Sequence, residues 1–330
     1  MKRPIILIFS AMLIMMVLSC NLPASVVAPP PASNPVPQTN NPTQPPAIAH
    51  QTTPGDVSLN GPINYDVDSS GNAPKHRAPY GDVYDLNRFE RPFTQKDMTY
   101  LPDVDITRFR LSSDDTWYYA FIELIGTNPN DSANVDYGIE IDKDRDGFGD
   151  ILIWAKPPYT TQWSTDGVTA YTDSNHDTGG VSAVKSDAPF SGNGYDTIIF
   201  SQGRGVDPDL AWARIDPKNP NVVEFAFKQS LPGPSFMWEA WADAGLRDPS
   251  KFNYNDRFTI QQAGSPQTDN YNYPVKALFA MDSTCRAAFG FTPTGYEPLL
   301  CPPITQPTPT GQPGEPKPKP NCPPTGIACP

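Results

Sequence analysis

Short apolar runs at a spacing of roughly 10 residues are the feature that most constrains how this chain can fold. Most of these runs alternate apolar and polar residues, and Gly, Asn, Asp or Pro bounds them. Amphipathic helical periodicity is not convincing over three turns anywhere in this region. The pattern predicts β-strands. The expected strands cover 104–111, 116–124, 135–142, 151–155, 167–172, 181–187, 195–201, 210–215, 222–228, 236–243 and 256–262.

These strands predict an all-β fold, a two-sheet antiparallel β-sandwich of a jelly-roll-like kind. All six Trp and every Tyr lie between residues 54 and 301. Because roughly 250 residues can bury one large core, we interpret 54–301 as a single domain.

Proline-rich segments flank this domain on both sides. Residues 21–53 contain no Asp, Glu, Lys, Arg or aromatic residue. They cannot bury enough apolar area to offset the entropy of ordering them, and their prolines favour an extended spacer. We therefore expect a disordered stalk over 21–53 and a disordered tail over 302–330.

The first 20 residues have the pattern of a secretory signal. Lys2 and Arg3 precede an apolar run that is short for a transmembrane helix, which needs roughly 20 residues. The run ends in Val-Leu-Ser before Cys20, which resembles a bacterial lipobox. The resemblance implies that Cys20 is lipidated and holds the mature protein on an extracytoplasmic membrane face. A cleaved signal and a free secreted protein is the alternative.

Four cysteines remain once Cys20 is assigned to the lipid: Cys285, Cys301, Cys322 and Cys329. Disulfides persist outside the cytoplasm, and four cysteines allow three connectivities. Pairing Cys285 with Cys301 and Cys322 with Cys329 closes the shortest loops and respects the proline-rich break between them. The absence of a CxxC pair disfavours a thiolate zinc site.

The charge balance limits the partners of the protein. The formal net charge is -12, and no basic cluster follows the signal. Nothing would neutralise phosphates, so the sequence argues against nucleic acid and against docking of the folded part on anionic lipid. Divalent cations are the natural partners of such an acidic chain.

The loop DKDRDGFGD between two expected strands is the strongest candidate for a cation site. Carboxylates occupy its first, third, fifth and ninth places, Asp142, Asp144, Asp146 and Asp150. Gly147 at the sixth place allows a sharp turn, as in loops that collect hard oxygen ligands around calcium. Ile153 replaces the bidentate Glu of an EF-hand, so the predicted site is a calcium-binding hairpin. A solvated hairpin turn is the alternative.

Two further loops carry a similar spacing. One holds Asp173, Asn175 and Asp177, and the other, DVDSSG, begins at Asp66. Asx-rich turns also arise for backbone reasons, so turn chemistry is the alternative for both.

Catalysis by the same acids is the least favoured interpretation. Glu140, Asp142 and Asp144 would share one face if their strand continued, and the EID stretch resembles part of a laminarinase-type glycosidase strand. However, Asp146 stands where that pattern has Glu, and Gly147 already indicates a turn. A serine triad has no support, because the chain has three His and no G-x-S-x-G.

The order VDITRFRLSSDDTWYYAFIEL, YGIEIDKDRDGFGDILIW, TDGVTAYTDSNHDTGG, VVEFAFKQSL and FMWEAWAD resembles the β-sandwich domains related to family 9 carbohydrate-binding modules and DOMON domains. The likeness covers 104–262. It implies a cell-surface module that binds sugars or, less often, haem, for which His76 and Met98 are the conceivable axial ligands.

Sugar binding needs exposed aromatic faces beside polar groups. Trp163, in the polar loop YTTQWSTDG, is the leading candidate, followed by Tyr159 and Trp212. The remaining Trp residues lie in expected strands and are assigned to the core or the sheet edges: Trp117, Trp154, Trp238 and Trp241.

The sequence thus predicts a surface-anchored lipoprotein that presents a calcium-stabilised β-sandwich to an extracellular ligand, with polysaccharide or cell-surface glycan as the favoured class. A structural or adhesive envelope protein without a small ligand is the alternative, and a glycoside hydrolase comes third.

Overall fold

The computed structural model describes residues 47–57, 60–76, 92–94, 97–178, 193–245, 247–251 and 280–302. The signal with Cys20, the stalk up to residue 46, the tail with Cys322 and Cys329, and the strands expected over 181–187 and 256–262 lie outside these residues.

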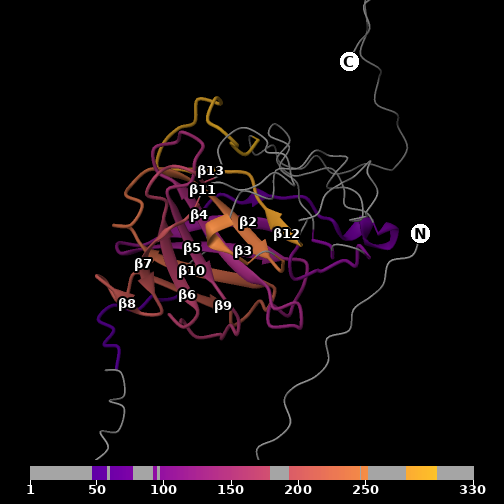
Figure 1. The fold of residues 1–330 in the computed structure, drawn as a ribbon, viewed down its shortest axis with the longest axis horizontal. Helices are drawn as coiled ribbons and strands as arrows, with labels where there is room; N and C mark the ends of the chain where they lie inside the picture. Colours follow the sequence, from indigo (N-terminus) through magenta and orange to yellow (C-terminus); the bar gives the residue numbers. More distant parts are fainter. Residues whose placement is uncertain are drawn as a thin grey trace, which may run out of the picture. The chain divides into compact units, whose positions relative to one another are not determined.

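The described strands form two antiparallel sheets, which confirms the predicted sandwich (Figure 1). The first sheet has the order β1-β2-β3-β10-β9. Its strands are β1 (Asn64–Tyr65), β2 (Ile106–Ser113), β3 (Trp117–Leu124), β10 (Val222–Lys228) and β9 (Ala211–Ile215).

The second sheet has the order β12-β11-β4-β5-β6-β7-β8, and β13 also pairs with β11. Its strands are β12 (Met281–Ser283), β11 (Phe236–Asp243), β4 (Asp136–Asp142), β5 (Ile151–Ala155), β6 (Val168–Thr172), β7 (Thr197–Ser201), β8 (Arg204–Gly205) and β13 (Ala287–Phe289). Nine strands expected from the sequence are present within a few residues of their predicted bounds, whereas the short β1, β8, β12 and β13 were not predicted.

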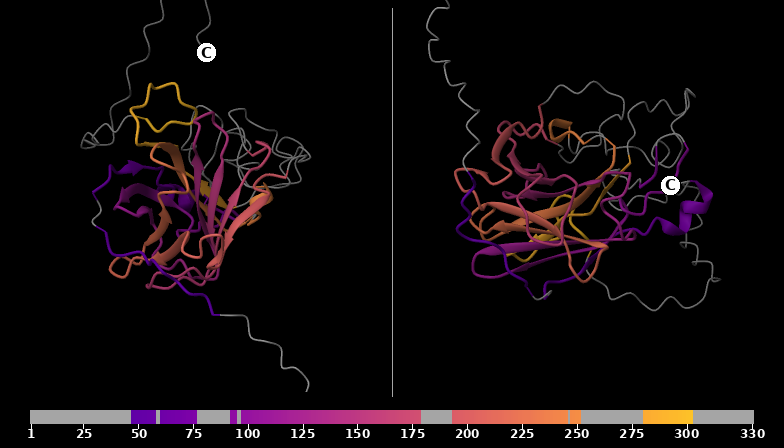
Figure 2. Two further views of the ribbon diagram at one scale, coloured as in Figure 1. Left: turned by 90° about the vertical axis from the view of Figure 1, so that its left-hand side faces the viewer. Right: turned by 90° about the horizontal axis from the view of Figure 1, so that it is seen from below.

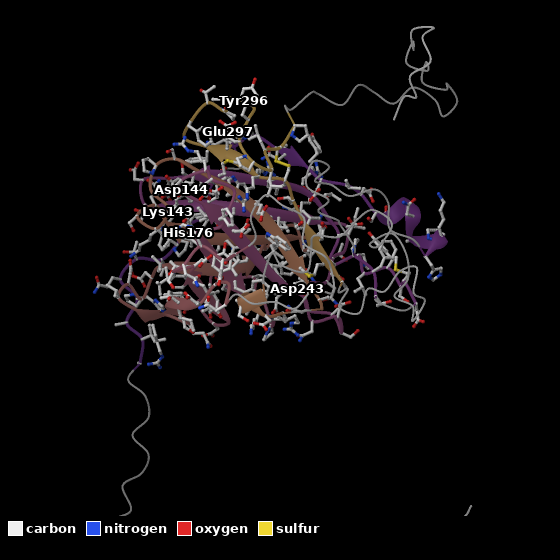
Figure 3. The ribbon with its side chains drawn as sticks, turned by 45° about the horizontal axis from the view of Figure 1, so that its top comes forward. Lys143, Asp144, His176, Asp243, Tyr296 and Glu297 are labelled. Carbon is white, nitrogen blue, oxygen red and sulfur yellow. A yellow bond between two sulfur atoms is a disulfide. The ribbon has the colours of Figure 1, made fainter. Side chains whose placement is uncertain are left out.

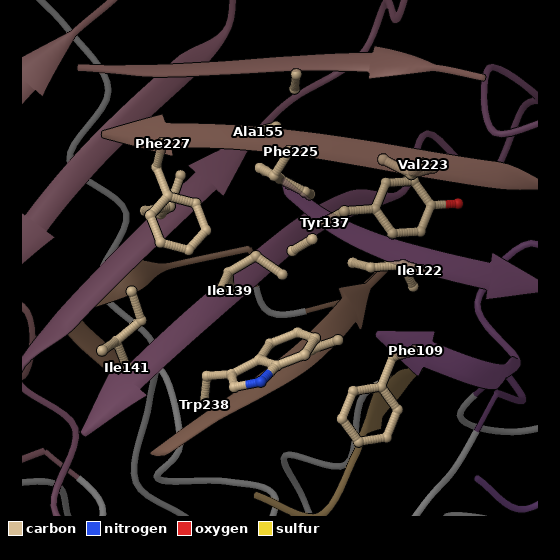
Figure 4. Packing of buried hydrophobic residues seen from close by; sticks show 14 of the residues in the cluster. Phe109, Ile122, Tyr137, Ile139, Ile141, Ala155, Val223, Phe225, Phe227 and Trp238 are labelled. Atoms are coloured by element: carbon tan, nitrogen blue, oxygen red, sulfur yellow. The ribbon is translucent and has the colours of Figure 1, made fainter. Parts of the chain in front are cut away.

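Alternation along the strands creates the core between the two sheets (Figure 4). In β4, Ile139 and Ile141 point into the core, while Glu140 between them points to the other face. Phe109 of β2 packs edge-on against Trp238 of β11, with ring centroids 5.2 Å apart. A side chain of this size in a close-packed core typically stabilises a fold by about 3–5 kcal/mol relative to alanine.

Both sheets also bury aromatic residues on their outer faces. On the first sheet, Trp117 and Tyr119 pack with Trp212. On the second, Trp154 and Trp241 pack with Leu152, Tyr195 and Met281. The four Trp residues assigned to the core or the sheet edges are at most 2% exposed, so each of them is packed: Trp117, Trp154, Trp238 and Trp241.

The folded unit begins at Ala47, within the part assigned to the stalk by sequence. Asp209 holds this N-terminal segment (residues 47–57): its carboxylate accepts hydrogen bonds from His50 Nδ1 at 2.7 Å, Gln51 N at 2.9 Å and Thr52 N at 2.8 Å. The His50 ring lies 4.5 Å from Trp212. Figure 2 shows the segment, in indigo, running along the sandwich. Residues 47–53 are therefore part of the folded unit although they carry no Asp, Glu, Lys or Arg, because Asp209 supplies their polar partner.

Cys285 and Cys301 form a disulfide, as the local pairing predicted. The described helices are the short 3-10 helices η1 (Ser70–Lys75) and η3 (Pro249–Lys251). Neither these nor any other described segment forms a helix with the length and apolar character needed to span a membrane.

Candidate functional site

The loop from Asp142 to Asp150, called the Asp loop below, joins β4 to β5. Strand β4 ends at Asp142, whose carboxylate accepts the backbone N–H groups of Arg145 at 2.6 Å and Gly147 at 3.0 Å. Gly147 has a φ of 97°, a left-handed conformation that glycine adopts without steric cost. Asp150 Oδ2 accepts the Lys143 N–H at 2.6 Å and closes the base of the loop. The first carboxylate thus organises the turn from inside.

Three carboxylates of this loop converge. Oxygen atoms of Asp142, Asp144 and Asp146 lie within 4.8 Å of one another. Asp142 is buried, and the other two are exposed. Figure 3 labels Asp144 of this loop beside Lys143. Within the described part of the chain this is the one group of acidic, His or Cys side chains close enough to share an ion. Hard carboxylate oxygens on a short turn are the donor set that calcium prefers, so these residues fit that metal.

The two exposed carboxylates each keep an oxygen atom that can bind a metal ion. Asp144 Oδ1 accepts the Asp146 N–H at 3.2 Å, and Asp146 Oδ1 accepts the Phe148 N–H at 2.8 Å. The second oxygen of each has no hydrogen-bond partner among the described residues. Each carboxylate can therefore bind a cation without giving up the bond that holds the turn.

Arg286 lies directly behind the Asp loop, fully buried among three buried carboxylates. Its Nη1 is 2.9 Å from Asp142 Oδ2, its Nη2 is 2.9 Å from Glu140 Oε2, and its Nε is 3.5 Å from Glu239 Oε2. We call Glu140, Asp142, Glu239 and Arg286 the acidic cluster. Glu140 and Glu239 are direct cross-strand neighbours on β4 and β11, so the sheet register places both beside the same guanidinium.

Burial and charge act against each other in this cluster. Burial by itself lowers the pKa of Arg286, but the charges of Glu239, Glu140 and Asp142 outweigh it and raise that pKa. Burial raises the pKa of Asp142 to about 6, although Arg286 and two backbone N–H groups work to lower it. Three carboxylates thus share the Arg286 guanidinium at the inner end of the Asp loop.

Neutral donors satisfy the remaining oxygens of the acidic cluster. Tyr195 donates its hydroxyl to Glu140 Oε1 at 2.6 Å, and Trp241 donates its indole N–H to Glu239 Oε1 at 2.9 Å. Gly149 of the Asp loop packs directly on this group. A Cβ at position 149 would lie 1.9 Å from the Tyr195 hydroxyl and 2.1 Å from Glu140 Oε1. The loop and the acidic cluster therefore pack as one unit.

The second Asp-rich loop repeats the turn but does not assemble the ligands. Asp173 accepts the N–H groups of His176 at 2.9 Å and Thr178 at 2.8 Å, the same relative positions as in the Asp loop. Asp177, however, accepts the Asn193 and Gly194 N–H groups at 2.9 and 2.7 Å, and the Asn175 amide donates to it at 3.1 Å. In this structure Asp177 connects the loop to residues 193 and 194, which precede β7.

The third loop has a different geometry. Asp66 accepts a hydrogen bond from the Val67 N–H at 3.0 Å, and the Ser69 N–H donates to Asp105 at 3.1 Å. From Ser70 the chain enters η1. Although its acids have a similar spacing in the sequence, this loop does not form the turn in which the first carboxylate accepts the N–H groups three and five residues later.

The three aromatic residues predicted to bind sugar are packed. Tyr159 is 7% exposed, and its hydroxyl lies 2.9 Å from both the Val135 and the Ala155 carbonyl oxygens, to which its one hydrogen can be donated. Trp212 is 4% exposed. The half-buried Trp163 lies under the Arg214 guanidinium, 4.3 Å from its ring centroid, and donates its N–H to Gly55 O at 3.2 Å. In this arrangement none of the three offers a free platform for stacking.

An open groove lies instead across the first sheet, lined by residues of β1, β2 and β3. It has a volume of about 510 Å³, and its lining includes Tyr65, Asp68, Arg108, Glu123 and Asn221. Tyr65 is 51% exposed. An exposed aromatic ring beside carboxylate, amide and guanidinium groups was not predicted, because Tyr65 stands on a strand of two residues that gives no periodic signal.

The geometry does not bring the candidate catalytic or haem groups into an open site. Glu140 and Asp142 do lie on one face of β4, but both are bound to Arg286 and fully buried. Met98 is fully buried, and His76 Nδ1 lies 3.1 Å from the Met98 carbonyl oxygen.

The sequence did not reveal Arg286, Glu239 and Tyr195 as partners of the Asp loop. They come from segments far away along the chain. Sheet register places Glu239, the Cys285–Cys301 disulfide lies next to Arg286, and Tyr195 reaches Glu140 through its hydroxyl. One signal was available for Glu239: it is an acid at an outward position in the otherwise apolar strand FMWEAWAD.

The described residues define a class by fold, the two-sheet antiparallel β-sandwich. No family model, curated protein or solved structure matches the chain. The resemblance to family 9 modules and DOMON domains stays a prediction.

Proposed function

We propose that this protein is an extracytoplasmic lipoprotein, anchored through Cys20, that presents a calcium-stabilised β-sandwich to an extracellular ligand, with carbohydrate as the ligand class. The observation that carries the proposal is the convergence of Asp142, Asp144 and Asp146 on one turn. Calcium would supply positive charge where these three carboxylates meet.

Several features support calcium over a merely solvated turn. The Asp142 carboxylate is buried, whereas a turn acid that only serves solubility would face water. The loop provides three carboxylate ligands, and water and backbone carbonyls would complete the 6 to 8 oxygens that calcium takes. We expect a dissociation constant of about 0.1–1 mM, the range of extracellular modules.

Thermal unfolding in excess calcium and in excess chelator tests this site. Saturation to roughly 100 times the dissociation constant adds about 2.7 kcal/mol to the free energy of unfolding, so the melting temperature should rise in calcium. The double substitution Asp144→Asn and Asp146→Asn should abolish the rise. The exposed Asp115→Asn removes one charge from another turn and should leave it intact. Equal melting temperatures in calcium and chelator would reject the site.

Support for carbohydrate comes from the groove beside Tyr65. Its open shape suits a chain that lies across a surface, and the combination of an aromatic ring with carboxylate and amide groups suits hydroxyl-rich ligands. The packed Trp163 does not contribute to this support.

Binding to immobilised polysaccharides tests the ligand class. Tyr65→Ala should lower binding about 10-fold or more, because loss of one stacking ring costs on the order of 1.5 kcal/mol. Tyr296→Ala is the matched control, since Tyr296 is 93% exposed and does not line the groove. If no polysaccharide is retained by the wild-type protein, the structural or adhesive role replaces carbohydrate binding.

A further inference from the structure

The segment from Cys285 to Cys301, called the disulfide segment below, contacts the Asp loop at two points. Arg286 bonds to the buried Asp142 carboxylate with a nitrogen to oxygen distance of 2.9 Å. Phe291 lies under the guanidinium of Arg145, 4.5 Å from guanidinium carbon to ring centroid. The segment therefore contacts both the first acid of the loop and the residue whose N–H that acid accepts.

The disulfide lies immediately beside the first of these contacts. Cys285 precedes Arg286, and its sulfur partner Cys301 donates its backbone N–H to the Arg286 carbonyl at 2.9 Å. The Arg286 N–H donates to Leu299 O at 2.8 Å. The disulfide thus links the two backbone segments whose hydrogen bonds position the Arg286 backbone.

Arg286 in turn determines how Asp142 is presented. Its Nη1 occupies Oδ2, while Oδ1 accepts the Arg145 N–H at 2.6 Å. The carboxylate is held from both sides in one orientation, with its charge partly balanced inside the fold. A carboxylate without this partner would be buried and uncompensated, and it would turn toward water or lose its charge.

We propose that Arg286 is the positioning residue of the cation site and that the Cys285–Cys301 disulfide sets the calcium affinity of the Asp loop. This coupling rests on the calcium site proposed above. The oxidised protein binds calcium more tightly than the reduced one. By linkage, calcium makes the disulfide harder to reduce by the same factor. Reduction by a dithiol breaks the sulfur–sulfur bond, takes two electrons and two protons from the dithiol, and leaves two cysteine thiols.

Calcium titration by calorimetry of the oxidised wild type and of the Cys285→Ser/Cys301→Ser variant tests the coupling. We expect at least about a 5-fold weaker affinity in the variant, the lower end of typical coupling between sites. The Ser variant isolates this bond from Cys322 and Cys329. A merely structural disulfide would lower the melting temperature in chelator without changing calcium affinity, and that result overturns the proposal.

A milder pair of variants tests the second contact without removing the covalent bond. Phe291→Ala should weaken calcium binding about 2- to 5-fold, because a cation–π contact made by an exposed cation such as Arg145 is worth on the order of 0.5–1 kcal/mol. Tyr296→Ala in the same disulfide segment is exposed and should leave affinity unchanged. Equal affinities of the two variants would count against coupling through the segment.

The wild-type protein provides the reciprocal measurement even where the Ser variant does not fold. Reduction of Cys285–Cys301 by dithiothreitol, followed by mass spectrometry of alkylated peptides, should need a higher dithiol concentration in calcium than in chelator. An identical midpoint overturns the coupling while leaving calcium binding in place. Failure of the oxidised wild type to bind calcium overturns the proposed site itself, and the coupling with it.

Discussion

Arg286 and Asp142 form a fully buried ion pair, 2.9 Å from Nη1 to Oδ2, between the disulfide segment and the end of β4. Both residues are inaccessible to solvent, and the same guanidinium also faces Glu140 and Glu239. Such a pair rarely adds stability over an apolar replacement of all its members, but removing one partner leaves uncompensated charge in the interior. The pair therefore makes the local fold sensitive to a single residue.

Replacing Arg286 with Met should destabilise the protein by about 3–5 kcal/mol, because three buried carboxylates lose their shared cation. Urea unfolding in chelator at neutral pH measures this change. Arg108→Met is the control, since the Arg108–Glu123 pair is partly exposed and should contribute at most about 1 kcal/mol. Comparable stability losses in the two variants would contradict the structural role assigned to the acidic cluster.

Glu224 of β10 should make stability depend on pH. Burial raises the pKa of Glu224 from 4.5 to about 7, against the opposing effect of the Arg214 ion pair. A raised pKa favours the folded state when the group is protonated, so this contribution is complete below pH 4.5 and is lost as the pH rises through 7. The loss amounts to about 3 kcal/mol, at 1.36 kcal/mol for each unit of pKa.

The variant Glu224→Gln should remove this pH dependence, because an amide stays neutral. Its stability relative to the wild type should rise between pH 5 and pH 8, in urea unfolding followed by Trp fluorescence. Glu123→Gln on the neighbouring strand controls for the loss of one acidic residue from the same sheet. Parallel pH profiles for wild type and Glu224→Gln would show that burial of Glu224 is not the cause.

Asp209→Ala should release the N-terminal segment. Three hydrogen bonds to His50, Gln51 and Thr52 are lost, which together should cost about 1–3 kcal/mol of local stability. Hydrogen exchange at the Gln51 and Thr52 amides should become much faster. Asp216→Ala, which removes a similar turn acid between β9 and β10, should leave these amides protected. Unchanged exchange in Asp209→Ala would show that other contacts hold the segment.

Cys20→Ala should move the protein from the membrane fraction to the soluble fraction of a bacterial host that processes lipoproteins. The reason is that the thioether-linked diacylglyceryl group and the amide-linked chain both depend on this residue. Mass spectrometry of the wild-type N-terminal peptide should show both groups. Cys322→Ala is the matched control and should stay in the membrane fraction. Release of the wild-type protein without detergent would contradict the anchor.

Local patterns predicted much of the fold because strand alternation is a property of neighbouring residues. The runs around Ile139 and Phe225 alternate in the sequence and lie in the core as expected. The short strands β12 and β13 were not predicted, since three residues give no periodicity and both form by pairing with β11.

The candidate site was predicted only in its local part. The spacing of Asp142, Asp144 and Asp146 predicts their convergence, because one turn connects them. The contact of Arg286 with Asp142 spans 144 positions and depends on sheet register. For Trp163, reasoning from sequence neighbours alone gave a wrong prediction. Its polar sequence neighbours suggested exposure, whereas Arg214, which lies far along the chain, covers its ring.

Calorimetric titration of the oxidised protein with calcium tests the central claim most directly. We predict one binding event with a dissociation constant of about 0.1–1 mM, retained in Asp115→Asn and absent from the Asp144→Asn/Asp146→Asn variant. Binding of equal strength in wild type and double variant would place calcium elsewhere, and no binding in the wild type would contradict the calcium-stabilised sandwich.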